Sequence, residues 1–84
     1  MATTTKKITL TGGWDKVALE GAATVEIGTS GYYTIDPPAA TVALSRGLSL
    51  NAMTEVSMLL KASEALFVKG DAGAILIVAA EQHA

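Results

Sequence analysis

The stretch that decides the fold is residues 65–79, which read ALFVKGDAGAILIVA. Two apolar runs lie on either side of the sequence Gly-Asp-Ala-Gly at residues 70–73. One aspartate and two glycines between apolar, β-branched runs are typical of a β-hairpin. We therefore predict strands at residues 65–69 and 74–79, paired through a tight turn.

The second of these strands is apolar on both faces. Side chains alternate along a strand, so Ile75 and Ile77 point to one side and Leu76 and Val78 to the other. A strand of this kind must be covered on both faces. Because a small two-layer fold has one interior, we predict that Leu76 and Val78 belong to a subunit interface. A loop or the N-terminal segment of the same chain is the alternative cover.

Period-two alternation recurs earlier in the chain, at residues 7–11, 14–19, 23–27 and 32–35. Gly-rich turns separate these runs, and the third and fourth are predicted to form a second hairpin. The sequence Asp-Pro-Pro at 36–38 ends it, because proline cannot donate to a strand ladder. The pattern predicts an all-β fold, a small jelly-roll-like β-sandwich or barrel of about seven short antiparallel strands.

The middle of the chain is less regular. Residues 41–44 are compatible with a short strand, 45–47 with a turn, and 48–51 with the approach to another loop. Residues 53–61 fit both a helix and an alternating strand with Val56, Met58 and Leu60 on one face. We favour the strand, because the elements around it are β.

The chain has 84 residues, which corresponds to one domain. Residues 1–7, Met-Ala-Thr-Thr-Thr-Lys-Lys, are predicted to form a flexible N-terminal arm, followed by a single β domain at 8–84. The arm either adds a strand to a neighbouring subunit or is a disordered terminus. No apolar stretch typical of an export signal follows the lysines, so we expect synthesis in a cytoplasm.

Composition favours self-association. Half of the residues are hydrophobic, 17% are charged and none is cysteine. A domain of this size has a small core, and disulfides, metals or association usually supplement it. Since the sequence offers neither of the first two, we expect a homo-oligomer. The longest apolar run, residues 74–80, is far shorter than the roughly 20 residues of a membrane span.

The charged residues exclude several other classes of function. The net charge is −2, and Lys6 and Lys7 are the only adjacent basic residues, so neither nucleic acid nor a membrane is an expected partner. Nucleophilic catalysis needs a base beside the nucleophile, and the one histidine, His83, is expected in a disordered C-terminal tail. We predict that the protein is not an enzyme and has no catalytic residue, metal or cofactor.

Three aromatic residues, Trp14, Tyr32 and Tyr33, are the candidate binding residues. Aromatic rings at such positions serve either as anchors of a core or protein interface, or as a platform on which sugars stack. We favour the first role.

The final hairpin, together with the threonine-rich start and Trp14 after a glycine pair, resembles small β-rich phage virion proteins such as capsid decoration (cement) proteins and short fibre proteins. The resemblance implies a structural protein, commonly a homotrimer, that bridges neighbouring subunits on the capsid surface. Its partner would be the major capsid protein or another virion protein. The resemblance also implies that this chain is made in the host bacterial cytoplasm and resides in the virion. The alternative is a carbohydrate- or receptor-binding module of a phage tail or fibre that uses Trp14, Tyr32 and Tyr33.

Overall fold

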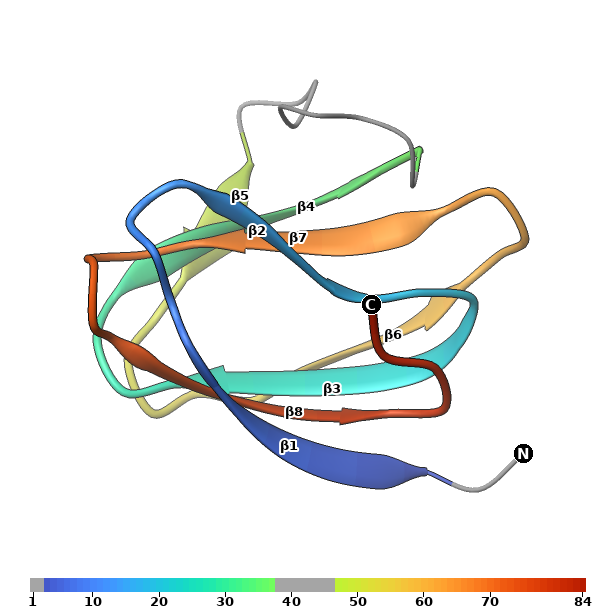
Figure 1. Cartoon of the computed structure of the whole chain (residues 1–84), viewed down its shortest axis with the longest axis horizontal. Coiled ribbons are helices and arrows are strands. Elements are labelled where there is room, and N and C mark those ends of the chain that lie inside the picture. The colour runs from blue at the N-terminus through green and yellow to red at the C-terminus, as the bar shows by residue number, and fades with distance from the viewer. Residues whose placement is uncertain (1–2, 38–46) are drawn as a thin grey trace.

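The computed structural model of the protein shows two four-stranded antiparallel sheets that pack face to face (Figure 1). It describes residues 3–37 and 47–84. Sheet A has the strand order β1-β8-β3-β6, and sheet B has the order β2-β7-β4-β5. The strands are β1 (Thr4–Thr9), β2 (Trp14–Ala18), β3 (Gly21–Ile27), β4 (Gly31–Asp36), β5 (Leu48–Leu50), β6 (Val56–Leu60), β7 (Ala65–Lys69) and β8 (Ile75–Ala80).

The strand order is that of a long antiparallel ribbon wound into a sandwich. Ladders join β1 to β8, β2 to β7, β3 to β6 and β4 to β5, so each strand pairs with its counterpart counted from the other end. Two further ladders, β3 with β8 and β4 with β7, complete the sheets. This is an eight-stranded jelly roll. The predicted fold class is confirmed, and the described residues contain eight strands where about seven were expected.

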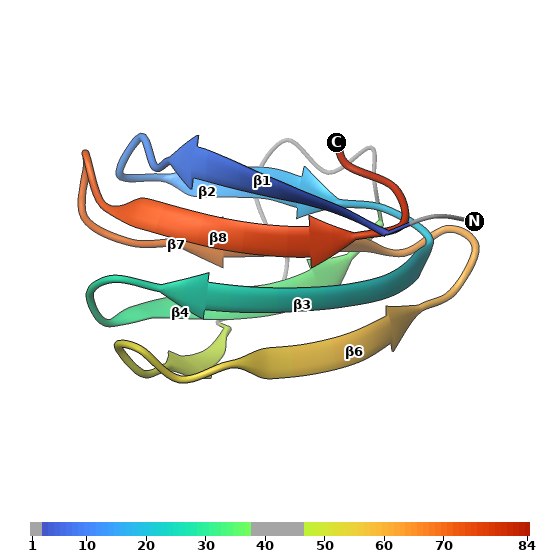
Figure 2. The ribbon, with the colours of Figure 1, turned by 90° about the horizontal axis from the view of Figure 1, so that it is seen from below.

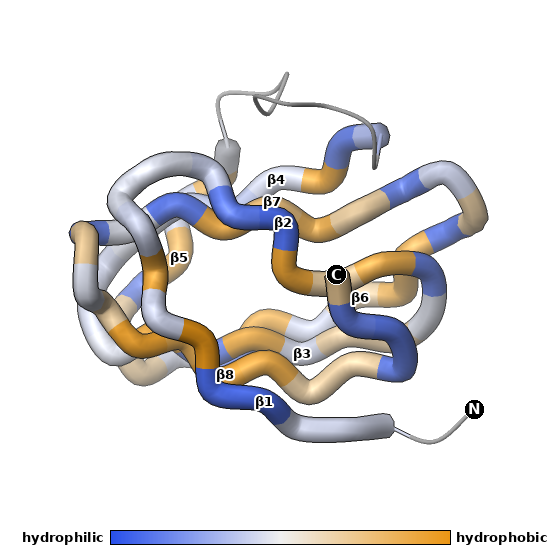
Figure 3. The backbone as a smooth tube through the Cα atoms, viewed as in Figure 1, coloured by the Kyte–Doolittle hydropathy of each residue, from blue (hydrophilic) through white to orange (hydrophobic). Residues whose placement is uncertain are grey.

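The core follows from the alternation. In β3, Ala23, Val25 and Ile27 are buried, while Thr24 and Glu26 lie on the opposite face. The same period brings apolar side chains from both sheets into one interior, and Figure 3 shows the hydrophobic residues concentrated along the central strands. The largest fully buried side chains are Leu10, Val17, Val25, Ile27, Leu50, Leu60, Leu66, Val68, Leu76 and Val78.

The strands predicted at 65–69 and 74–79 are confirmed, but their pairing as a hairpin is wrong. β7 belongs to sheet B and β8 to sheet A, so the turn between them crosses from one sheet to the other (Figure 2). β3 and β4 are separated in the same way. In each case the strands pair with more distant segments: β7 lies between β2 and β4, and β8 lies between β1 and β3.

The middle region resolves in favour of strands. β6 confirms the strand interpretation of residues 53–61. β5 forms where the sequence indicated only the approach to a loop, and its three residues are too few to show alternation. The predicted short strand at 41–44 and most of the turn at 45–47 lie outside the described residues.

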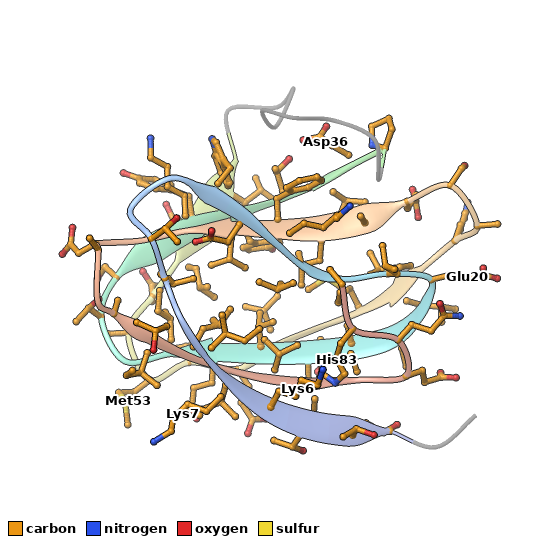
Figure 4. All side chains as sticks on the ribbon, in the orientation of Figure 1. Lys6, Lys7, Glu20, Asp36, Met53 and His83 are labelled. Atoms are coloured by element: carbon orange, nitrogen blue, oxygen red, sulfur yellow. The ribbon has the colours of Figure 1, made fainter. Side chains whose placement is uncertain are left out.

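Both chain ends differ from the predictions. Residues 4–7 of the predicted arm are part of β1, which pairs with β8 of the same chain. As an edge strand, β1 needs no continuous apolar face, because its backbone hydrogen bonds hold it in place. His83 does not lie in a disordered tail. Its backbone forms a bridge with Ala18, and its Nε2 lies 2.7 Å from the carbonyl oxygen of Thr4 (Figure 4).

Candidate protein-binding surfaces

Strand β8 has one face in the core and one at the surface. Leu76 and Val78 are fully buried between the sheets, so they cannot form the predicted subunit interface. Ile75 and Ile77 point outward and keep 39% and 37% of their surface exposed. The sequence correctly indicated a second apolar face on this strand but not which residues occupy it, because both pairs are equally apolar.

The outer face of sheet A, which we call the A face, surrounds these two isoleucines with two charged side chains and several short ones. In the strand register, Ile77 lies between Lys7 of β1 and Glu26 of β3. In the next row, the hydroxyl groups of Thr24 and Ser57 are hydrogen-bonded at 2.9 Å. The register places the following residues on this face: Thr5, Lys7, Thr9, Ala22, Thr24, Glu26, Ser57, Leu59, Ile75, Ile77 and Ala79.

The outer face of sheet B carries two of the three candidate aromatic residues. Lys69 of β7 pairs with Trp14 on one side and with Tyr32 on the other. The Lys69 Nζ lies 6.0 Å from the centroid of the Trp14 ring, at the limit of a cation–π contact. Tyr33 points to the opposite side of the sheet and packs against the core. The three aromatic residues therefore do not form one platform.

Trp14 is fixed by the backbone that precedes β5. Gly47 has a φ of 87°, and a Cβ at this position would lie 2.6 Å from the Trp14 Cη2. The ring thus packs over a glycine that no larger residue could replace without movement. Trp14 is half-buried, whereas Tyr32 is 51% exposed.

A shallow hollow of about 250 Å³ lies beside Tyr32. Three turns form it, and its polar lining comes from Ser30, Lys69 and Asp71. Such a hollow can accept a ligand that donates and accepts hydrogen bonds. The complete lining is Gly12, Ser30, Gly31, Tyr32, Lys69, Gly70, Asp71 and Ala72.

Within residues 3–37 and 47–84, no group of three or more histidine, aspartate or glutamate side chains is placed to hold a metal ion. The same residues contain no helix that is long and apolar enough to cross a membrane. Comparison of the chain with protein-family models, curated proteins and solved structures finds no match to any of them.

Proposed function

We propose that this chain is a non-enzymatic structural protein that decorates and stabilises a phage capsid, binding the major capsid protein or another virion protein through the A face. The observation that carries this proposal is the exposure of Ile75 and Ile77, 39% and 37%, on an inner strand of sheet A. Single exposed apolar residues are common, but neighbouring ones on a sheet favour a contact surface.

The surroundings of the isoleucines also support a protein partner. Lys7 and Glu26 flank Ile77, so charged groups border an apolar centre, as in many protein interfaces. Short threonine, serine and alanine side chains leave few obstacles to close approach. A rigid sandwich with such a face stabilises a shell mechanically, by binding subunits that would otherwise separate.

Self-association would increase this effect. An oligomer that contacts two capsid subunits binds the second at a high effective concentration. It thereby bridges subunits without any further contact within each module. The sequence resemblance favours an oligomer for this role.

The test is the composition and stability of phage particles. We expect mass spectrometry of purified particles to detect the protein in stoichiometric amounts relative to the capsid protein. Particles produced without the gene should release their DNA at a lower temperature than wild-type particles. If the protein is missing from purified particles, the proposal is wrong.

A second candidate function is carbohydrate or receptor binding by a phage tail or fibre module. It is favoured by the position of Tyr32, which is exposed beside the hollow that Ser30 and Asp71 line. Trp14 would contribute from the same face, whereas Tyr33 would not. We expect a glycan array to show binding that Tyr32→Ala removes and Leu48→Ala, at another exposed position of sheet B, preserves. A wild-type protein that binds no glycan contradicts this candidate.

A further inference from the structure

Among the described strands, three of the four sheet edges are protected against pairing with another chain. In β1, Lys6 and Lys7 are adjacent, and charged residues of this kind hinder edge-to-edge contact. In β2, the register shifts between Lys16 and Ala18, and Ala18 also forms the bridge with His83. β5 has only three residues. Bulges, coverage and short length are all known to block edge pairing.

The fourth edge, β6, has none of these features. Its five residues, VSMLL, include no charge and no proline, and its register with β3 is unbroken. Leu59 is 75% exposed on its outer side. Figure 2 shows β6 at the margin of sheet A, where its outer edge has no partner among the described strands. An edge of this kind is a template for an added strand.

We propose that β6 is the contact of a homodimer, in which it pairs antiparallel with β6 of a second copy about a two-fold axis at Met58. Charge complementarity selects both the partner and the register. In this register Glu55, just before β6, lies opposite Lys61 of the second copy, and the symmetry repeats the pair. Opposite charges across neighbouring strands are stabilising. If one strand shifts along the other, Glu55 and Lys61 no longer lie opposite each other at either end.

The same register also matches apolar side chains. On the core side, Val56 lies opposite Leu60 of the second copy, and the half-buried Met58 meets its own equivalent. On the A face, the two Leu59 side chains are diagonal neighbours across the axis, within reach of each other. The dimer merges two copies of sheet A into one eight-stranded sheet. Both pairs of exposed isoleucines then lie on the same side of this sheet.

Charge reversal tests the contact in the full-length protein. We expect sedimentation equilibrium to give a wild-type mass about twice the monomer mass of 8.6 kDa. Glu55→Lys and Lys61→Glu should each weaken the dimer at least tenfold, because each places like charges opposite one another twice. The double variant should regain wild-type affinity. A monomeric or trimeric wild type, or equal affinities for all four proteins, overturns the proposal.

Cysteine cross-linking tests the register, and the chain has no native cysteine to interfere. Directly opposed residues on antiparallel strands have Cα atoms about 4.5–5.5 Å apart, which suits a disulfide. We expect mild oxidation to cross-link Met58→Cys at least tenfold faster than Ser57→Cys, whose equivalents are diagonal and too far apart. Equal rates, or a faster Ser57→Cys, contradict the axis. The dimer contact does not depend on the proposed function. If the protein forms the dimer but is absent from phage particles, only the proposed function is wrong.

Discussion

The two apolar inner strands β7 and β8 differ in what covers their second faces. Four of the five residues of β7 are buried, and Phe67, on its outer side, is only 3% exposed. In β8, Leu76 and Val78 are buried, whereas Ile75 and Ile77 are more than one-third exposed. The chain itself covers both faces of β7 but only one face of β8. A strand that is apolar on both faces thus needs other residues packed on both of them. The fold determines whether those residues come from the same chain.

The largest expected effect is on the covered side of β7. Phe67→Ala should lower the free energy of unfolding by about 3–5 kcal/mol, because it removes a buried ring and leaves a cavity. The matched change on β8, Ile77→Ala, should cost no more than about 1 kcal/mol, since part of that side chain is already exposed. Urea denaturation of both variants checks the difference. Equal losses would contradict the contrast between the two strands.

A smaller effect is expected at Gly47, which lies against the ring of Trp14 on the outer face of sheet B. Gly47→Ala should cost about 2 kcal/mol, because alanine is unfavourable at positive φ and its Cβ would displace the ring. Trp14 is the only tryptophan, so its fluorescence should shift as the ring moves. Gly73→Ala is the control, since Gly73 has a φ of 90° but no atom within 4 Å of an added Cβ. If both variants lose the same stability and neither alters the fluorescence, the packing of Trp14 contributes nothing.

The smallest expected change in stability comes from neutralising one acidic residue on each outer face. Asp36 is 6% exposed and has an interaction partner, so Asp36→Asn should cost about 1 kcal/mol because it weakens the polar interaction of a buried group. Glu26 lies on the A face, and Glu26→Gln should change stability by less than about 0.5 kcal/mol. Thermal denaturation of the two variants at pH 7 measures the difference. A larger loss for Glu26→Gln would mean that the A face is held together by its charges.

The sequence was sufficient for the fold class because alternation survives in most strands, as Ala23, Val25 and Ile27 illustrate. It could not give the pairing of β7 and β8, since a tight turn can either fold a hairpin or cross between sheets. Nor could it orient β8, because period two separates Leu76 from Ile77 without indicating which side is inside. The alternation at residues 7–11 predicted only the second half of β1, because the first half of this strand is polar. The three residues of β5 were too few to be recognised as a strand. Their backbone ladders with β8 and β4 define them.

The candidate surface was predicted in kind but not in its residues. The expectation of a second, exposed apolar face on β8 was correct. However, Ile75 and Ile77 form this face, and Leu76 and Val78 lie in the core. Tyr33 is not part of the candidate aromatic surface. Tyr32 and Tyr33 are neighbours on β4 and point to opposite faces, so Tyr33 packs against the core. The open edge of β6 emerged only once the other strands had been placed, since an edge is defined by the absence of a neighbour.

We propose above that the exposed face of β8 binds another virion protein. The most direct measurement is co-sedimentation of added protein with phage particles produced without it. We predict that the double variant Ile75→Thr and Ile77→Thr remains folded, because threonine retains β-branching, but no longer sediments with the particles. The control Leu48→Thr, at an exposed position of sheet B, should bind as the wild type does. If the double variant binds with wild-type affinity, the A face is not the contact and the proposed function is wrong in this respect.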